Sequence, residues 1–252
     1  MTDHILTEIQ STDAGGSVLA LRMNRADKKN AITSAMYDAL SDGLDRAAGD
    51  DDLRCAVILG SGGVFCAGND IADFIKAASS PEGMKSTLRF LDTLARFPKP
   101  LVAGVDGVAV GVGTTMLMHC DLVLATGRSM FQTPFVDLGL VPEAGSSWLA
   151  PRIMGHQNAF AMLGLGEKFT AEEANRAGLV NAVILDADVE AMERAMALAA
   201  KPPEALRISR ELVRGDRTEL YARMDEEAKL FGERLQSGEA QAAFMAFMSK
   251  GR

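Results

Sequence analysis

Two stretches of the chain share one hydrophobic pattern, a short apolar run of strand-forming residues that ends in a cluster of glycines. Ala56-Val57-Ile58-Leu59 precedes GSGGVFCAGNDI at residues 60–71, and Leu101-Val102-Ala103 precedes VDGVAVGVGTTMLMHCD at residues 105–121. Short apolar runs bounded by glycine are typical of buried strands, and each glycine cluster leads into a predicted helix. A helix start leaves backbone N–H groups free. Two such turns side by side would aim two N–H donors at one oxygen, which is the arrangement of an oxyanion hole.

Two common nucleotide-binding motifs do not match these glycines. A phosphate-binding P-loop needs Lys and then Ser or Thr after its second glycine, whereas Asn69 and Asp70 follow Gly68 here. A dinucleotide-binding fingerprint needs a third glycine, and Met116 stands where it would be. Ordinary strand–helix turns without a ligand remain an alternative, because isolated glycine motifs are weak signals.

The first half of the chain predicts strands that alternate with helices. The expected elements are a β-hairpin at 4–10 and 17–23, a helix from the N-cap Thr33 to about Gly49, a strand at 53–59, helices within 71–97 broken at Ser79-Ser80-Pro81, and strands at 101–105 and 121–125. Strand–helix alternation of this kind predicts an α/β fold in which helices cover a parallel sheet.

The second half of the chain changes to loops and then to helices. A helix is expected to start near Ser146, and Thr170 with Glu173 forms a predicted capping box. The last 65 residues are almost wholly helical, with apolar residues at amphipathic spacing. We therefore divide the chain into a core at 1–187 and a helical C-terminal region at 188–252, which would cover the core or pack on another subunit.

Composition narrows the class of protein. The chain has 252 residues and a net charge of −8, and this acidic balance argues against a nucleic-acid partner. The cysteines Cys55, Cys66 and Cys120 lie far apart and are expected to be free thiols, and the three histidines lack metal-ligand spacing. No signal peptide, membrane-spanning stretch or peroxisomal Ser-Lys-Leu ending is visible, so a soluble cytoplasmic protein without a membrane partner is expected.

Longer motifs resemble those of the crotonase superfamily of enoyl-CoA hydratases and isomerases along nearly the whole chain. FCAGNDI at 65–71 and DGVAVGVG at 106–113 resemble the two oxyanion-hole segments of that family. FQTPFVDLGLVPEAGSSWLAPRIMG at 131–155 and PPEALRISR at 202–210 resemble the peroxisomal-type Δ3,Δ2-enoyl-CoA isomerases. The resemblance implies a crotonase-like fold of repeated ββα units, with the CoA and acyl site in the core. It also implies a helical C-terminal trimerisation region, and hence a homotrimer or a hexamer made of two trimers.

The resemblance also implies a set of site residues. The backbone N–H groups of Ala67 and Val112 would bind the thioester oxygen of an acyl-CoA, with Gly111 shaping the second turn. The expected substrate contacts are Lys28, Cys66, Ala67, Gly68, Asn69, Asp70, Ile71, Gly111 and Val112, with Asp70, Ile71 and the loop at 25–28 facing the CoA moiety. CoA is part of the substrate, so no separate cofactor and no metal is implied.

The resemblance separates two reactions. Family hydratases use two glutamates, at the positions that are Thr115 and Phe135 here, whereas Glu143 matches the single catalytic glutamate of the isomerases. One carboxylate in an apolar pocket can remove a proton from C2 of 3-enoyl-CoA and return it to C4. The expected function is a Δ3,Δ2-enoyl-CoA isomerase of fatty acid β-oxidation. An enoyl-CoA hydratase, a thioester hydrolase and a non-catalytic acyl-CoA-binding protein remain alternatives.

Several of these residues could instead have a purely structural role. Glu143 could be a loop residue, Asp70 a helix N-cap, Lys28 a solvated charge, and Thr115 and His119 packed helix residues. Asp137 is a further carboxylate near the site in sequence.

Overall fold

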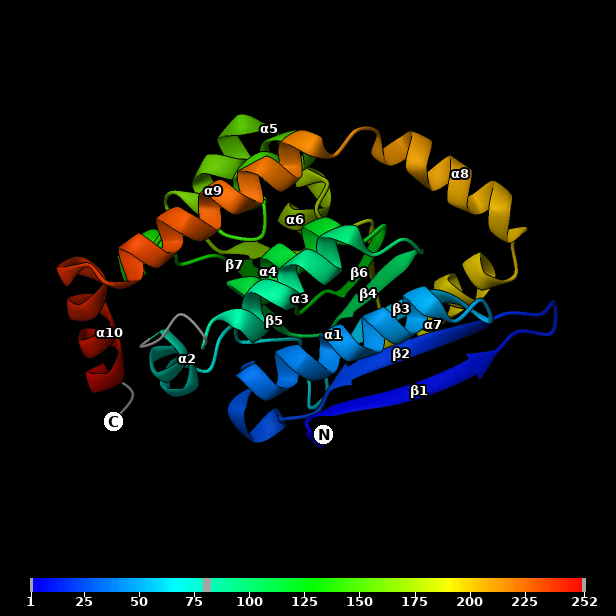
Figure 1. Cartoon of the computed structure of the whole chain (residues 1–252), viewed down its shortest axis with the longest axis horizontal. Helices are drawn as coiled ribbons and strands as arrows, with labels where there is room; N and C mark the ends of the chain where they lie inside the picture. Colours follow the sequence, from blue (N-terminus) through cyan, green and yellow to red (C-terminus); the bar gives the residue numbers. More distant parts are fainter. Residues whose placement is uncertain (1, 79–82, 251–252) are drawn as a thin grey trace.

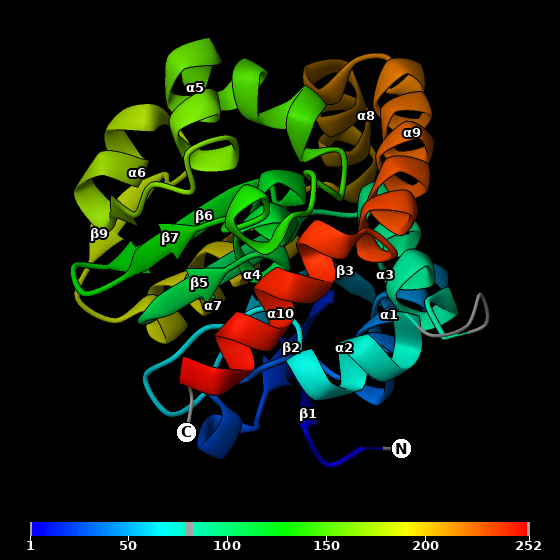
Figure 2. The same cartoon turned by 90° about the vertical axis from the view of Figure 1, so that its left-hand side faces the viewer.

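The computed structural model describes residues 2–78 and 83–250 and contains two β-sheets surrounded by helices (Figures 1 and 2). The strands of the large sheet, in spatial order, are β1 (Ile5–Ser11), β2 (Ser17–Met23), β3 (Leu53–Leu59), β4 (Leu101–Val105), β6 (Leu122–Thr126) and β9 (Ala182–Ile184). β1 and β2 form an antiparallel hairpin, and every other neighbouring pair is parallel. The predicted hairpin and the predicted α/β fold with a parallel sheet are confirmed.

A second, three-stranded sheet was not predicted from the sequence. It consists of β5 (Val108–Val110), β7 (Met130–Gln132) and β8 (Phe169–Thr170), with β5 and β7 parallel and β7 and β8 antiparallel. Strands of two or three residues are too short to show an alternating pattern, so loops were expected beyond residue 131.

The structure contains the helices that the sequence predicted from Thr33, near Ser146 and from the Thr170 capping box. They are α1 (Ser34–Gly49), α2 (Ile71–Ala78), α3 (Lys85–Arg96), α4 (Val112–Thr115), α5 (Ser146–Leu163), α6 (Ala171–Ala177), α7 (Ala187–Ala199), α8 (Pro203–Arg214), α9 (Thr218–Leu235) and α10 (Gly238–Lys250), with 3-10 turns η1 (Ala26–Lys28), η2 (Met116–His119) and η3 (Val136–Leu138). The Thr33 N-cap and the Thr170–Glu173 capping box are both present. The expected break at Ser79-Ser80-Pro81 lies outside the described residues.

The large sheet separates two hydrophobic layers. Along β3, Cys55, Val57 and Leu59 pack toward α7, while Ala56 and Ile58 point into the main core beside α1 and α3. This alternation is the expected consequence of the two-residue period of a strand buried on both faces. Helix α7, the first helix of the C-terminal region, packs on this sheet against β2, β3, β4 and β6.

The last three helices behave differently from one another. α8 buries none of its residues and exposes Leu212 and Val213. α9 and α10 turn back over the core, where Phe231 and Phe244 contact Phe74 of α2 with ring centroids 6.1 and 6.5 Å apart. Figures 1 and 2 show α10 beside α2. The C-terminal region therefore covers part of the core.

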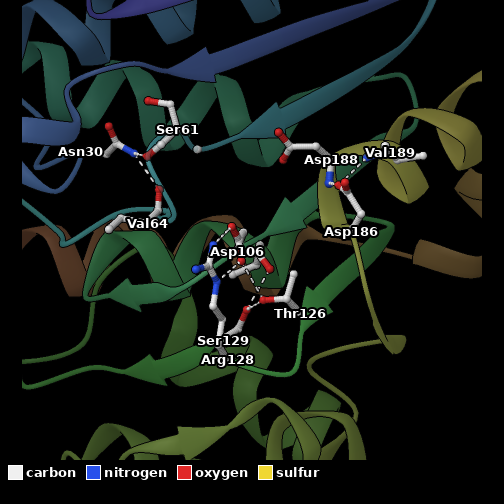
Figure 3. Close-up of polar contacts among 12 residues, drawn as sticks. Asn30, Ser61, Val64, Asp106, Thr126, Arg128, Ser129, Asp186, Asp188 and Val189 are labelled. Atoms are coloured by element: carbon white, nitrogen blue, oxygen red, sulfur yellow. Dashed lines mark hydrogen bonds and ion pairs between the residues drawn. The ribbon is translucent and has the colours of Figure 1, made fainter.

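Polar side chains fix the loops that follow the strands (Figure 3). The buried amide of Asn30 donates to the carbonyl oxygens of Ser61 (3.0 Å) and Val64 (2.7 Å), which ties the η1 loop to the first glycine turn. Asp106, after β4, accepts a hydrogen bond from the Thr126 hydroxyl at 2.8 Å. Within the described part of the chain, no group of three or more His, Cys, Asp or Glu side chains is arranged to hold a metal ion.

Among the residues that the structure describes, none of the helices combines the length and the apolar character needed to cross a bilayer.

Candidate active site

Two cavities meet at Glu143. The first, of about 890 Å³, lies between the two glycine turns, and the second, of about 490 Å³, lies between α3 and α9. The residues that line both cavities are Asn69, Phe74, Glu143 and Phe231. Glu143 is the only ionisable residue among these four, so its carboxyl group lies where a ligand that occupied both cavities would pass.

Most of the predicted substrate contacts line the first cavity. They are Lys28, Ala67, Gly68, Asn69, Asp70, Ile71, Gly111 and Val112. The prediction for Cys66 is wrong, because its side chain is fully buried and its Sγ lies 3.4 Å from the Gly68 amide. Cys66 pairs with Ala109 in an isolated parallel bridge, so its backbone is extended here. Neighbouring side chains on extended backbone point to opposite sides, so the side chain of Cys66 points into the core while Ala67 lines the cavity.

The same bridge brings the two glycine turns together, as the sequence predicted. The Cys66 amide donates to the Val108 carbonyl at 3.0 Å, and the Val110 amide donates back to the Cys66 carbonyl at 2.9 Å. The turns approach so closely that a Cβ atom on Gly68 would lie 3.0 Å from the Val110 oxygen, so only glycine fits there.

The predicted amide donor in the first turn is wrong by two residues. The Ala67 N–H already donates to the Lys29 carbonyl at 3.0 Å and is not available to a ligand. Ile32 pairs with this turn through the Gly68 carbonyl and the Asp70 amide, at 2.8 and 2.9 Å. The Asn69 N–H lies between these two bonds and has no hydrogen-bond partner within the described residues. It is therefore a free donor of the first turn, at a residue that lines the first cavity.

In the second glycine turn, the predicted donor, the Val112 amide, has no hydrogen-bond partner among the described residues. Gly111 has φ 55° and ψ −121°, a conformation that glycine adopts readily, and its own amide donates to Gln132 at 2.8 Å. Val112 is the first residue of α4, and its N–H has no partner in the part of the chain that is described. The Thr114 and Thr115 amides both donate to the Gly111 carbonyl. The Val112 amide is thus an unpaired helix-start donor facing the cavity.

Glu143 lies on the loop before α5. The residue is half-buried, and it lines both cavities. The pKa of its carboxyl group is raised to about 8: burial is the main cause, a hydrogen bond from Thr115 opposes the rise, and the nearby Glu227 adds to it. A carboxyl group with a pKa near neutrality can both accept and donate a proton under ordinary conditions.

Two buried side chains, Thr115 of α4 and His119 of η2, form hydrogen bonds with the loop that carries Glu143. The Thr115 hydroxyl donates to Oε1 of Glu143. His119 donates from Nε2 to the Ala144 carbonyl at 2.7 Å, and burial lowers its pKa to about 3, so the ring is neutral. The packed role expected for His119 is confirmed. The contact of Thr115 with Glu143 was not predicted, because their separation in sequence carries no signal.

Tyr37 on α1 is a site residue that sequence reasoning missed. Its ring is almost completely buried, and its hydroxyl donates to Oδ1 of Asn69 at 2.6 Å. This bond fixes the orientation of the Asn69 side chain beside the free Asn69 amide. Burial raises the pKa of Tyr37 well above its usual value, and the neighbouring Glu143 adds to that rise, so the phenol stays a hydrogen-bond donor.

Asp70 is the N-cap of α2, as one interpretation of the sequence held. Its Oδ1 accepts from the Ala72 and Asp73 amides, each at 3.1 Å, and its Oδ2 pairs with Arg25 at 2.8 Å. Burial opposes ionisation of this carboxyl group, but the Asp73 amide and Arg25 outweigh it and lower the pKa of Asp70. Lys28 is exposed at the rim of the first cavity, where it can meet an anionic group.

The second cavity has a mostly apolar wall with one charged end. Figure 1 shows α3 and α9, the helices that form this wall. The apolar lining comprises Phe74, Met84, Leu88, Leu91, Met224, Ala228, Phe231 and Leu235, and the polar lining includes Asp92, Arg96, Tyr221 and Asp225. Such a chamber fits an alkyl chain. Asp137 is exposed and lines neither cavity, so it is not a candidate for the chemistry.

Comparison with known proteins agrees with this geometry. The family model for enoyl-CoA hydratase/isomerase matches residues 13–252. The chain is 38% identical to enoyl-CoA delta isomerase 2 of Rattus norvegicus over 243 residues, which cover 93% of this chain and 62% of the relative. The chain therefore spans less than two thirds of that relative's length.

Two solved structures cover nearly the whole length of the chain. The structure of Pseudomonas aeruginosa OdaA has a TM-score of 0.89 and 39% identity, and covers 98% of this chain and 99% of its own. The enoyl-CoA hydratase/isomerase from Pseudoalteromonas atlantica T6c has a TM-score of 0.89 and 37% identity, and covers 97% of each chain. This chain belongs to the enoyl-CoA hydratase/isomerase family, and it has the crotonase-like fold that the sequence motifs implied.

Proposed function

We propose that the protein is a Δ3,Δ2-enoyl-CoA isomerase, which moves the double bond of a 3-enoyl-CoA to the 2-position with a single carboxyl group. The observation that carries this proposal is the position of Glu143, the one ionisable residue described that lines both cavities. The CoA moiety occupies the first cavity, the acyl chain occupies the second, and the thioester lies at their junction. The isomerase name of the rat relative supports the same reaction.

The chemistry uses two backbone donors and one proton carrier. The Asn69 and Val112 amides bind the thioester oxygen. The Glu143 carboxylate removes a proton from C2, and the electron pair moves toward the carbonyl to give a dienolate with its charge on that oxygen. The protonated Glu143 then delivers the same proton to C4, which forms the 2-enoyl product without a change of mass. Preorganised donors stabilise the oxyanion because they are already aimed at it before the reaction starts.

Hydration is less well supported, because it needs a second group to activate water. The positions that carry glutamates in hydratases are Thr115, whose hydroxyl binds Glu143, and Phe135, which is buried. Asp70 is the other carboxylate in the first cavity, and it is held by the start of α2 and by Arg25. None of these groups is free to act as a second base.

The setting of the reaction follows from the same proposal. A step that shifts a double bond into the 2-position serves fatty acid β-oxidation, and we infer that the enzyme acts there in the cytoplasm. The apolar residues exposed on α8 support assembly into a trimer or a pair of trimers. Sedimentation at micromolar concentration tests this, and a monomer there would contradict it.

Product analysis tests the proposed reaction. A medium-chain 3-enoyl-CoA and its 2-enoyl isomer are incubated separately with the enzyme, and the products are identified by mass. Isomerisation leaves the mass unchanged, hydration adds one water, and thioester hydrolysis releases free CoA. We expect conversion of the 3-enoyl-CoA at constant mass with little hydration. Tight binding without turnover of any chain length would instead favour a binding protein.

A further inference from the structure

Glu227 on α9 is a second buried carboxylate close to the active site. It is 4% exposed, its Oε2 accepts from the Gly145 amide at 2.6 Å, and its Oε1 accepts from the Ser147 amide at 2.9 Å. These two amides belong to the start of α5, directly after Glu143 and Ala144. The first amides of a helix have no partner within the helix and carry partial positive charge. Glu227 therefore occupies two amides at the start of α5, two and four residues after Glu143.

The turn that Glu227 holds is conformationally demanding. Ala144 has φ 60° and Gly145 has φ 69°, in the left-handed region that non-glycine residues rarely adopt. α9 packs so close that a Cβ atom on Gly145 would lie 2.4 Å from a Leu220 methyl carbon. His119 of η2 donates a hydrogen bond to the Ala144 carbonyl of the same turn. The direction in which the Glu143 side chain leaves the backbone thus depends on the hydrogen bonds at this turn.

Glu227 also changes the charge around Glu143. A free helix start beside a carboxyl group would stabilise its ionised form. Burial raises the pKa of Glu227 itself, while its hydrogen bonds from Ser147 and Gly145 favour its ionised form. Glu227 thus takes these amides, and its ionised form raises the pKa of Glu143. The other ionisable groups near Glu143 or on the two cavities that it lines are the Tyr37 phenol from α1, the neutral His119 ring from η2, Asp92 and Arg96 from α3, Tyr221 and Asp225 from α9, and Lys28 and Asp70 of the first cavity.

We propose that Glu227 is a positioning residue for the reaction: it fixes the turn that carries Glu143 and withholds the α5 amides from the Glu143 carboxylate. The inference rests on the proposed function, in which Glu143 carries the proton. It adds a role for α9, the helix that also forms the wall of the acyl chamber through Met224, Ala228 and Phe231. The same helix, α9, then forms part of the wall of the second cavity and holds the turn that carries Glu143.

The test compares two substitutions of Glu227 that differ in charge. Glu227→Gln keeps the size and removes the charge, so the acid limb of the kcat/KM profile for 3-enoyl-CoA should move to lower pH by roughly half to one unit. Glu227→Asp keeps the charge and shortens the reach, so kcat should fall roughly tenfold or more without that shift, because a small misplacement of the base is costly. Glu233→Gln, an exposed position on the same helix, is the control and should match the wild type.

Each outcome decides the inference. A purely structural role would lower stability and the height of the profile in both variants and leave the acid limb in place, which would overturn the proposal. Wild-type kinetics in both variants would also overturn it. If Glu227→Gln does not fold, Glu227→Asp decides: a loss of kcat at unchanged stability and with an unmoved limb supports the inference, whereas an unchanged kcat, or a loss of kcat that accompanies a loss of stability, contradicts it.

A readout without turnover separates this inference from the proposed function. A carbon-13 NMR titration of glutamate carboxyl groups, with the Glu143 signal assigned by its loss in Glu143→Gln, reports the ionisation of Glu143 directly. The midpoint should fall in Glu227→Gln whatever reaction the enzyme catalyses. An unchanged midpoint refutes the role of Glu227, whereas a wild-type enzyme that does not isomerise 3-enoyl-CoA refutes the proposed function alone.

Discussion

The Thr115 hydroxyl donates a hydrogen bond to Oε1 of Glu143, across 28 residues of sequence. The contact joins the helix after the second glycine turn to the loop that starts α5, so the free Val112 amide and the Glu143 carboxyl group are held in one frame. The resemblance of the sequence motifs implies a glutamate at the place of Thr115 in hydratases. In the proposed mechanism, threonine at this position leaves Glu143 as the single acid–base group and donates a hydrogen bond to it.

Removing the Thr115 hydroxyl should destabilise the ionised form of Glu143. Thr115→Val keeps the shape and deletes the hydroxyl, so the pKa of Glu143 should rise and the acid limb of kcat/KM should move to higher pH by roughly half to one unit. Thr115→Ser keeps the hydroxyl and serves as the control. The measurement is a pH–rate profile for 3-enoyl-CoA, and a limb that stays in place in Thr115→Val would contradict the assigned role.

The oxyanion hole can be tested at one backbone atom. Val112 is the first residue of α4, a position where proline is tolerated, and proline has no N–H. Val112→Pro should lower kcat/KM by roughly 100- to 1,000-fold, the usual loss for one oxyanion donor. Val112→Ala keeps the amide and should retain activity. Far-ultraviolet circular dichroism checks that both variants fold. A folded Val112→Pro enzyme with full activity would exclude this amide from the reaction.

Burial of Glu143 should make the stability of the protein depend on pH. Its folded-state pKa of about 8 lies above the usual value for glutamate, so folding favours the neutral form. Below about pH 4.5 both states are protonated and there is no penalty, whereas the penalty grows as pH rises toward 8. Glu143→Gln has no such penalty. Its advantage in the free energy of unfolding should grow with pH to roughly 3–5 kcal/mol. Urea unfolding at pH 5 and pH 8.5 measures this, and a constant difference would refute the shifted pKa.

The second cavity should set chain-length preference. Ala228 lies on its wall, so Ala228→Trp should fill part of this cavity. We expect kcat/KM to fall roughly tenfold or more for long-chain 3-enoyl-CoA and little for a four-carbon substrate, because a filled pocket excludes only the longer chain. Ala222→Trp, at an exposed position of α9, is the matched control. An equal loss with every chain length would place the acyl chain elsewhere.

Much of the framework could be predicted from the sequence, because its signals are local. The apolar runs before each glycine cluster predict β3 and β4, and the caps at Thr33 and Thr170 predict helix starts. The glycine turns also predict that free amides lie side by side. Local patterns of this kind depend on residues that are neighbours in the chain, so one sequence contains them.

The parts that were missed depend on contacts between distant segments. The choice of Asn69 over Ala67 as the amide donor depends on which carbonyl groups Lys29 and Ile32 offer to the turn. Tyr37 and Glu227 reach the site from helices α1 and α9, which lie far apart in the sequence. No spacing rule connects such positions, and only the folded chain brings them together.

The turnover number of Glu143→Gln with a medium-chain 3-enoyl-CoA tests the central claim most directly. Glutamine keeps the size and the hydrogen bond from Thr115 but cannot carry the proton between C2 and C4. We predict that kcat falls by roughly 100- to 10,000-fold while KM changes little, since the loss is of acid–base catalysis alone. The wild type should give 2-enoyl-CoA of unchanged mass. Undiminished isomerisation by Glu143→Gln would show that another group moves the proton and would contradict the single-carboxylate mechanism.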